Sequence, residues 1–352
     1  MNKQQHLDLL AELIACHAPP GDEDEIEAVI LREFESTGAK VWQDDATNIY
    51  AHLPGSGPKV MVCAHKDEIG MIITAVQEDG RLKVSNIGGS MPWKYGEGPV
   101  DILADDGSLV RAILSVGSTH TRVGHMHELK SSRALTWDLV TLFTGLTALE
   151  LAEKGVHVGS RAVVARERKA VQHLGDYVAS YALDDRMGLV SLIAALKEMA
   201  QKSDPVQRAD LYFVACHGEE IGMLGALRAA HTLQPNIVVA LDTSPVTQDT
   251  PTSLDGRPII WYGEGAFNTK SDCDTLLRLA GELGFGAQPC VYNAAASDAG
   301  GIRRHGLAGR TLAFGFPRDN SHGYEIAHAD SLVNVSSLLV AYLQQLTSQS
   351  SR

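Results

Sequence analysis

The sequence predicts an α/β fold, a mostly parallel sheet with helices on both faces that is interrupted by a small β unit. From Leu183 onward, short apolar runs alternate with helical patterns, which is typical of parallel strands joined by helices. From about Gly70 to Ala165 the pattern changes to short alternating segments with Asp-Gly turns. We therefore expect one α/β domain formed by residues 1–70 and 166–352, with an insert at residues 71–165.

The N-terminal part is expected to hold two helices and a strand. Helical periodicity covers Leu7 to Ile14 and Asp22 to Ser36, with a break at Pro19–Gly21 between them and a stop at Gly38. The segment Lys59 to Ala64 ("KVMVCA") is a nearly continuous apolar run. Such a run is typical of a strand that is covered on both faces.

The insert and the second half complete the expected order of elements. In the insert, "MIITAVQEDGRLKVSNIGG", "VDILADDGSLVRAIL" and "SRAVVA" are expected to form a small antiparallel β unit. In the second half, the expected helices are Met187–Ala200, Ile221–Ala230, Asp274–Leu283 and a last helix from about Ser331, and the expected strands are Leu211–Ala215, Ile237–Leu241 and Thr311–Phe316.

Composition excludes several classes of protein. With 44% apolar and 21% charged residues the 352-residue chain can bury a core, and its net charge of -13 without a Lys/Arg-rich run argues against a nucleic-acid or anionic-membrane partner. The five cysteines are widely spaced and include no CxxC pair, which fits a reducing cytoplasm. We expect neither a signal peptide nor a membrane span, because no window is apolar over about 18 residues.

Ligand-type side chains follow the predicted strands of the α/β part. Because ligands bind in the crevice at the carboxyl ends of parallel strands, these side chains are expected to converge. They are His65, Asp67, Asp184, Asp185, Glu219, Glu220, Asp242 and His322.

Imidazoles mixed with carboxylates and without thiolates favour zinc, cobalt or manganese over calcium or magnesium. The set is too large for one ion, so two ions that share a bridging carboxylate and a bridging water fit better. The adjacent pair in "ACHGEEIGMLGA" allows two roles: one glutamate holds a metal and its neighbour takes the proton of the water.

Each residue also has a structural explanation. The pair Asp184–Asp185 and the pair Glu219–Glu220 could cap the helices that follow them, since acidic residues are favoured at helix N-termini. His217 is expected to be only a neighbour that lines the cleft, and the histidines of "THTRVGHMH" (His120, His125, His127) are expected on a surface loop of the insert. Taken together, the number and type of groups at strand ends favour a site.

The ordered segments "AHKDEIGM", "ALDDRMG", "HGEEIGMLGA", "ALDT", "SDAG" and "SHGYE" resemble metallopeptidase family 42, the glutamyl and tetrahedral (TET) aminopeptidases, some of which carry endoglucanase labels. The resemblance extends over nearly the whole chain. It implies a metal-dependent, cytoplasmic aminopeptidase that acts on short peptides.

The resemblance also implies a role for each residue. His65, Asp184 and Asp242 would bind one metal, and Asp184, Glu220 and His322 the other, with zinc as the first expectation and cobalt or manganese as alternatives. Glu219 would be the general base, and Asp67 would orient His65 by accepting its second ring N–H. The insert would be a PDZ-like dimerisation domain, and dimers would assemble into a hollow tetrahedral dodecamer.

One segment departs from the family pattern. An Arg-Tyr pair usually comes shortly before the last histidine, whereas this chain has Asp319 and Asn320 in "GFPRDNSH", with Arg318 one place earlier. The departure leaves His322 in place and puts substrate choice or local oligomer contacts in question.

Other functions remain open from the sequence. A related dinuclear-metal deacylase would use the same residues, and a catalytically silent assembly protein could keep the same fold. A glycoside hydrolase would instead need two carboxylates that flank a sugar without a metal.

Overall fold

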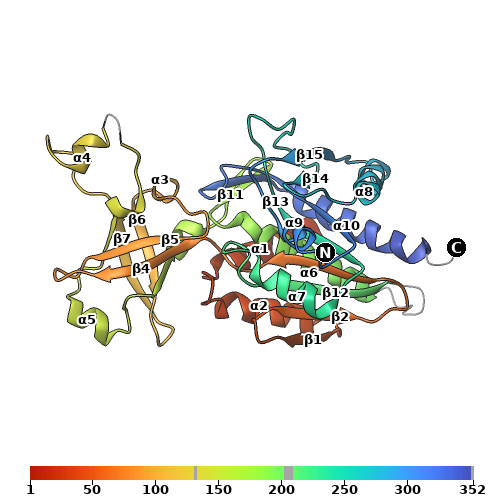
Figure 1. The fold of residues 1–352 in the computed structure, drawn as a ribbon, viewed down its shortest axis with the longest axis horizontal. Helices are drawn as coiled ribbons and strands as arrows, with labels where there is room; N and C mark the ends of the chain where they lie inside the picture. The colour runs from red at the N-terminus through yellow and green to blue at the C-terminus, as the bar shows by residue number, and fades with distance from the viewer. Residues whose placement is uncertain (131–132, 202–208, 350–352) are drawn as a thin grey trace.

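The chain forms two parts, an α/β part and a small β-barrel to one side of it (Figure 1). The computed structural model describes residues 1–130, 133–201 and 209–349. The barrel is drawn at the left of Figure 1, and both chain ends belong to the α/β part at the right.

The helices and strands have the following bounds. The α-helices are α1 (Lys3–Ala15), α2 (Asp24–Glu35), α3 (Pro92–Tyr95), α4 (His125–Glu128), α5 (Ala148–Glu153), α6 (Leu183–Gln201), α7 (Leu224–Leu233), α8 (Lys270–Glu282), α9 (Asp298–Arg304) and α10 (Asp330–Gln349). The strands are β1 (Lys40–Gln43), β2 (Ile49–Leu53), β3 (Lys59–His65), β4 (Gly70–Val76), β5 (Leu82–Ile87), β6 (Gly98–Leu103), β7 (Leu109–Ser115), β8 (Thr141–Phe143), β9 (Arg161–Val164), β10 (Gln172–Leu174), β11 (Tyr177–Ser180), β12 (Asp210–Cys216), β13 (Ile237–Pro245), β14 (Ile259–Glu264), β15 (Gln288–Tyr292), β16 (Arg310–Asp319) and β17 (Glu325–His328).

The large sheet has a parallel centre and antiparallel flanks. Its order is β1-β2-β12-β3-β13-β16-β17-β11-β10, and β14 pairs with β15 and β16. The four central strands β12, β3, β13 and β16 are parallel to one another. β2 joins this centre antiparallel on one side, and β17 and β11 continue it antiparallel on the other.

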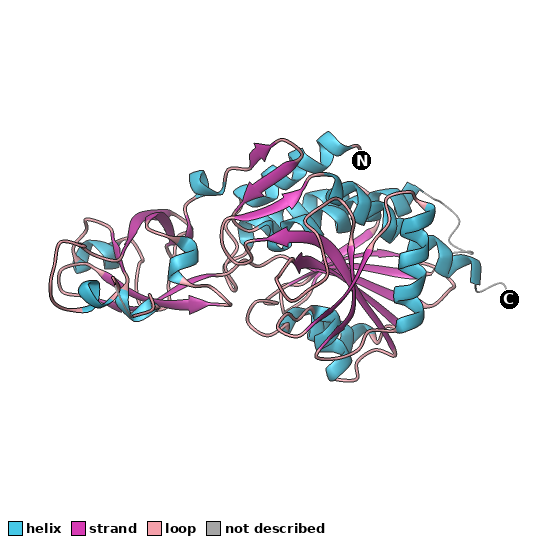
Figure 2. Cartoon of the chain, turned by 90° about the horizontal axis from the view of Figure 1, so that it is seen from above, coloured by secondary structure: helices cyan, strands magenta, loops and turns pink. Residues whose placement is uncertain are grey.

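Both faces of the sheet centre are buried, which explains its nearly continuous apolar strands. In β3, Val60, Val62 and Ala64 belong to one core cluster, while Met61 and Cys63 belong to the opposite one. The first cluster is covered by α1, α2, α6, α8 and α10, and the second by α7 and α9. Figure 2 shows the helices on the two sides of the fan of strands. Successive side chains of a strand point to opposite faces of the sheet, and here both faces are apolar.

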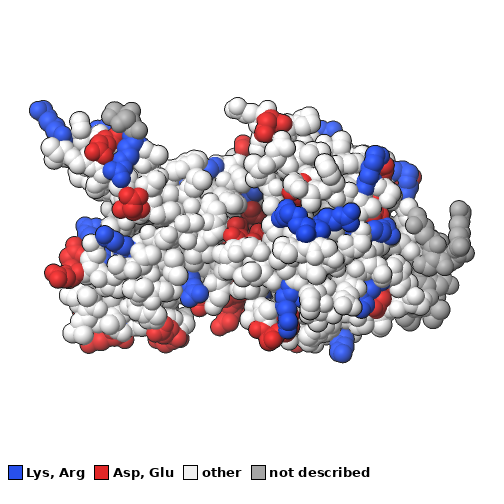
Figure 3. Space-filling view, viewed as in Figure 1, with Lys and Arg blue, Asp and Glu red and all other residues white. Residues whose placement is uncertain are grey.

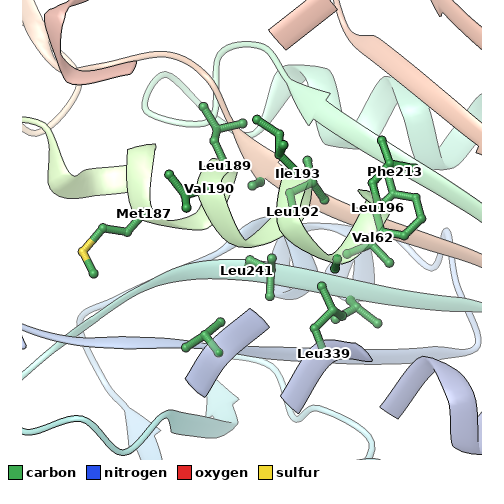
Figure 4. Close-up of a cluster of buried hydrophobic side chains, with 14 of the residues drawn as sticks. Val62, Met187, Leu189, Val190, Leu192, Ile193, Leu196, Phe213, Leu241 and Leu339 are labelled. Carbon is green, nitrogen blue, oxygen red and sulfur yellow. The ribbon is translucent and has the colours of Figure 1, made fainter. Parts of the chain in front are cut away.

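Helix α6 lies at the centre of the larger core. It packs against β13, β3 and α10. Figure 4 shows Leu192 and Leu196 of this helix close to Val62 of β3, Leu241 of β13 and Leu339 of α10. All five side chains are fully or almost fully buried. This packing sets the position of the first turn of α6, which carries site residues.

The insert is a closed six-stranded barrel in the order β4-β5-β8-β7-β6-β9. Its neighbouring strands are antiparallel. The barrel has a core of its own that includes Met71, Val100, Leu114 and Leu142. The predicted α/β class with a small additional β unit is therefore confirmed, whereas the proposed boundaries at residues 71 and 165 remain a prediction.

The structure differs from the expected elements at the flanks of the sheet and at the start of α7. The flanking strands β1, β10, β14 and β17 are short or irregular in pattern, and the sequence did not identify them. The helix expected from Ile221 begins at Leu224, because Gly218, Gly222 and Met223 have positive φ values and form a loop instead. Within the described residues, no helix is both long and apolar enough to cross a membrane.

A buried carboxylate joins the barrel to the α/β part. Asp101 of β6 is 2% exposed, and its Oδ2 atom lies 3.0 Å from Nε2 of His17, which follows α1. The carboxylate also accepts the backbone N–H of Arg166 at 3.1 Å and Nε–H of Arg111 at 2.8 Å. Burial opposes ionisation of Asp101, but the hydrogen bonds from His17, Arg166 and Arg111 outweigh it and lower the pKa of Asp101 to about 2.

We predict that Asp101→Asn lowers the free energy of unfolding at pH 7 by about 2 kcal/mol, because a pKa lowered from 3.8 to about 2 stabilises the fold wherever the carboxylate is ionised. The difference from wild type should fall to about half near pH 3 and vanish below pH 2. Urea unfolding at both pH values measures it. Asp45→Asn, at an exposed surface pair, is the control and should change stability by less than about 0.5 kcal/mol. A pH-independent effect of Asp101→Asn would contradict this account.

Candidate functional site

Parallel pairing brings three of the predicted site segments to one edge of the sheet. His65 is the last residue of β3, and its register partner in β12 is Cys216, after which the loop with Glu219 and Glu220 begins. Asp242 lies on the other neighbour of β3, inside β13, which continues to Pro245. These side chains come from adjacent strands and therefore meet.

Asp184 reaches the same place by another route. It follows β11, an antiparallel flanking strand, and lies in the first turn of α6. The carboxylate of its neighbour Asp185 accepts the backbone N–H of Gly188 at 3.1 Å, so Asp185 has the helix-capping role that the sequence allowed for the pair. Asp184 is left to face the site, where its Oδ1 lies 3.1 Å from Nε2 of His65.

Two groups of possible cation ligands share Asp184. Ligand atoms of His65, Asp184 and Glu220 lie within 4.8 Å of one another, and so do those of Asp184, Asp185 and Asp242. His322 Nε2 lies 3.7 Å from Oδ2 of Asp184 and 3.9 Å from Oε1 of Glu220. The five predicted metal ligands therefore lie around Asp184, but the structure groups His65 with Glu220, and Asp242 with Asp185, rather than His65 with Asp242 as predicted.

Asp67 holds the two-glutamate loop. Its Oδ1 accepts the backbone N–H of Glu219 at 3.0 Å and its Oδ2 accepts that of Glu220 at 3.1 Å. The nearest contact of His65 Nδ1 is the backbone oxygen of Asp67 at 3.1 Å, and the Asp67 carboxylate is 3.5 Å away. Either contact favours a proton on Nδ1, which leaves Nε2 of His65 free to face Asp184.

Arg318 and Glu325 form a buried support for Asp184 that the sequence did not assign. Nη1 of Arg318 lies 2.5 Å from Oδ2 of Asp184 and 2.5 Å from Oε1 of Glu325. Glu325 in turn accepts the backbone N–H groups of Asp184 and His322, each at 3.0 Å. Asp319 and Asn320, which replace the family's Arg-Tyr pair, are exposed beside this network.

The barrel supplies one wall of the site through the turn after β5. Nδ1 of His322 lies 3.2 Å from the backbone oxygen of Gly89, so its Nε2 faces the carboxylates. A Cβ atom on Gly89 would come within 2.5 Å of the His322 ring, and one on Gly88 within 3.1 Å of Glu220. Close approach of the backbone therefore explains these two glycines, which lack the spacing of a phosphate-binding loop.

A cleft of about 360 Å³ opens over these residues, lined by Asp184, Glu219, Glu220, Asp242, His322 and Arg318 together with neutral side chains. On the face that Figure 3 shows, basic and acidic side chains are interspersed, and acidic ones gather in the hollow between the two parts. The site is thus an acidic recess at the junction of barrel and sheet.

Burial and mutual repulsion shift the pKa values of the carboxyl groups in the site. Burial raises the pKa of Glu220 to about 7, although His322 opposes the shift. Burial also raises the pKa of Glu219 and of Asp242 well above the usual range, with nearby carboxylates adding to both shifts. The exception is Asp184: burial opposes its ionisation, but Arg318 and His65 outweigh it and lower its pKa. Such crowding favours protonation or a bound cation.

The donor set fits divalent cations. Two ligands that each lie about 2.0–2.2 Å from a tetrahedral zinc ion are roughly 3.3–3.6 Å apart, and His65 Nε2 and Asp184 Oδ1 are slightly closer, at 3.1 Å. The His322 contacts of 3.7 and 3.9 Å are slightly wider. A divalent cation bound there would offset the negative charge of the carboxylates, whose ionised forms are destabilised by burial.

The other histidines considered in the sequence lie outside the cleft. Nδ1 of His217 is 2.8 Å from Glu23 in a separate cavity, so His217 does not line the cleft beside Glu219. His120, His125 and His127 are exposed in the inserted part, as expected, but His125 and His127 lie in the short helix α4 rather than in a loop.

Known proteins match both the sequence and the fold. A family model described as M42 glutamyl aminopeptidase matches residues 47–338. A putative aminopeptidase of Acetivibrio thermocellus is 30% identical over 72% of this chain and 70% of that protein. A lysyl aminopeptidase of Pyrococcus furiosus is 31% identical over 62% of this chain and 60% of that protein. The aligned region thus spans well under the full length of these relatives.

Solved structures extend the likeness to nearly the whole chain. An aminopeptidase of the archaeon Desulfurococcus kamchatkensis has a TM-score of 0.87 at 26% identity and covers 99% of this chain and 98% of that one. The Pyrococcus horikoshii TET1 peptidase has a TM-score of 0.82 at 24% identity over 97% and 99% of the two chains. The latter likeness shows the fold alone.

We predict that Gly89→Ala weakens binding of a divalent ion at this site by about 10- to 100-fold, because the added methyl group displaces His322 while the backbone φ tolerates alanine. Titration of chelator-treated protein with zinc or manganese in a calorimeter measures it. Gly281→Ala is the matched control, since a Cβ atom there meets nothing within 4 Å. Equal affinities for wild type and Gly89→Ala would refute the role of this turn.

We predict that Arg318→Gln costs about 3–5 kcal/mol of unfolding free energy in chelator, because Asp184 and Glu325 are left as buried, uncompensated charges. Saturating divalent metal should reduce this loss, since a cation beside Asp184 replaces the missing positive charge. Urea unfolding with and without metal tests both statements, with the exposed Arg228→Gln as control. A loss that is small, or identical in the two conditions, would show that Arg318 does not balance the charge of the site.

Proposed function

Because the chain belongs to the M42 glutamyl aminopeptidase family, we propose that it is a metal-dependent aminopeptidase that removes N-terminal residues from short peptides. The observation that carries the proposal is the convergence of His65, Asp184, Glu220, Asp242 and His322 on one cleft, with Glu219 beside them. These residues come from five separate segments of the chain. A layered fold does not by itself need such a concentration of acids at one point.

The proposed metal ligands form two sets with Asp184 in common. His65, Asp184 and Asp242 would hold one divalent ion, and Asp184, Glu220 and His322 the other, with zinc preferred and cobalt or manganese possible. When bound, the ions supply Lewis acidity, which activates water and polarises the carbonyl group of the scissile peptide bond. Asp67 and Glu325 orient the ligands through the hydrogen bonds described above.

Glu219 is the proposed general base. Its backbone is held by Asp67, and its side chain lines the cleft without being one of the proposed ligands. A carboxylate oxygen of Glu219 accepts the proton that the attacking water loses and then donates it to the nitrogen of the leaving peptide. Burial raises the pKa of Glu219, so this carboxylate binds a proton more tightly than a solvent-exposed one. This suits a group that must hold the proton between two steps.

We also propose a homo-oligomer in the cytoplasm. The Pyrococcus horikoshii TET1 peptidase is described as assembling into a tetrahedron or a large octahedral shell, and this chain shares its fold. The barrel would form the dimer contact, and dimers would build a tetrahedral dodecamer. The five cysteines are buried and free, which is compatible with a reducing compartment.

We predict that Glu219→Gln lowers kcat by at least about 10²-fold and leaves the content of divalent metal unchanged, because Gln cannot take up the proton but keeps the shape of the side chain. Aminoacyl-chromophore hydrolysis after reconstitution with zinc, cobalt or manganese measures turnover, and elemental analysis measures metal. Glu153→Gln, at an exposed position of the barrel, is the control. An active Glu219→Gln enzyme would refute the assignment.

Chelation and N-blocked substrates separate the proposal from its alternatives. A metallo-aminopeptidase should lose activity in chelator, regain it with metal, and refuse peptides whose N-terminus is acylated. Hydrolysis of the acylated peptides alone would indicate a deacylase. Activity on polysaccharide that survives chelation would indicate a glycoside hydrolase.

A further inference from the structure

Two chemically different sets of residues line the cleft beside Glu219. The first set consists of the proposed metal ligands and the general base. The second set, called the neutral wall below, includes Met223, Pro245, Trp261, Ala294, Ala295 and Ala296. The whole cleft, at about 360 Å³, is near the lower end of the range of about 300–1,000 Å³ for small-molecule sites.

The neutral wall is the part of the cleft that remains for the side chain that decides substrate choice. In an aminopeptidase only one residue precedes the scissile bond, so the cleft holds a single side chain on that side of the reacting carbonyl. The reacting carbonyl has to lie next to Glu219 and the proposed ligands. The side chain of the N-terminal residue would then contact the neutral wall.

Every charged side chain that lines the cleft is already engaged. The acids and His322 belong to the proposed metal ligands and general base. The one other charged residue in the described lining, Arg318, is 3% exposed and pairs with both Asp184 and Glu325. No counter-ion in this lining is therefore left for a charged substrate side chain.

Hydrogen bonds fix part of the neutral wall, and small side chains in it leave space for a substrate side chain. Trp261 is 1% exposed, and its Nε1–H donates to Oγ of Ser244 at 2.7 Å. The hydroxyl of Tyr292 donates to the backbone oxygen of Pro245 at 2.9 Å. The side chains of residues 294–296, which also line the cleft, end at Cβ, which leaves room for an aliphatic side chain of intermediate size.

Two charged residues close to this wall do not belong to the lining of the cleft. Arg304 is exposed; its Nη2 lies 3.8 Å from the sulfur atom of Met223, and its Nη1–H donates to the backbone oxygen of Glu264 at 3.3 Å. The carboxylate of Glu264 accepts the hydroxyl of Ser297 at 2.8 Å and is 2% exposed. Neither charge therefore faces the described lining as a free counter-ion.

We infer that the enzyme selects peptides with a neutral, apolar N-terminal residue such as Leu, Met or Ala, and discriminates against Lys, Arg, Asp and Glu. The inference rests on the proposed function, because it names the substrate class of that same site. Its physical reason is desolvation: a charged side chain would leave water for a wall that offers it no partner.

The test uses the metal-reconstituted full-length enzyme with Leu-, Met-, Ala-, Lys- and Glu-chromophore substrates. We expect kcat/KM for the best neutral substrate to exceed that for Lys and Glu by at least about tenfold. Turnover with Lys or Glu equal to or better than neutral residues would overturn the inference and leave the proposed function intact. Absence of turnover with every substrate, at full metal content, would refute the proposed function and the inference with it.

Substitutions at Ala295 and Ala296 test whether this wall is responsible. Ala295→Asp should raise the Lys-to-Leu ratio of kcat/KM by at least about tenfold, whereas Ala295→Asn, which has the same size without the charge, should leave the ratio within about threefold. Ala296→Asp is the second variant, in case the half-buried Ala295 does not accept a carboxylate. If both Asp variants are folded and metal-loaded and their Lys-to-Leu ratios of kcat/KM equal that of the wild type, the assignment of this wall to the substrate side chain is overturned.

Discussion

The structure depends on keeping several carboxylates buried next to one another. Asp184 is at the centre of this constraint, because His65 and Arg318 contact it directly and His322 is close by. Its own pKa is lowered, while those of Glu219, Glu220 and Asp242 are raised by burial and by their neighbours. Such an arrangement is stable only with compensating positive charge. Arg318 supplies one such charge from the protein, and the remainder is the reason to expect cations.

The two parts of the fold meet this constraint together. The doubly covered sheet fixes the ends of β3, β12 and β13, and α6 is fixed by its packing between the sheet and α10. The barrel then closes the site from the other side through Gly89 and is tied to the α/β part by Asp101 and His17. The insert therefore shapes the candidate site and also offers a candidate surface for assembly. Because His322 contacts Gly89 of the insert, a fixed position of the insert also fixes the position of His322.

Much of the architecture could be predicted because it follows from local patterns. Continuous apolar runs identified the central strands, and their ends located His65, Glu219 and Glu220. The contacts of Arg318 with Asp184, and of Gly89 with His322, join residues more than 130 positions apart, and no local pattern encodes them. Flanking strands such as β10 and β17 depend on pairing with neighbours rather than on their own sequence. The loop before α7 was misread as helix because its apolar residues fit a helical period, although Gly218 and Gly222 signalled a turn.

The most direct measurement of the central claim is the number of divalent ions bound per chain by wild type, Asp184→Asn and Glu220→Gln, determined by calorimetric titration of chelator-treated protein. The account predicts two ions for wild type, one strongly bound ion for Glu220→Gln, and loss of both high-affinity sites for Asp184→Asn, since only Asp184 belongs to both ligand sets. Undiminished binding of two ions by Asp184→Asn, or no high-affinity ion in wild type, would contradict it.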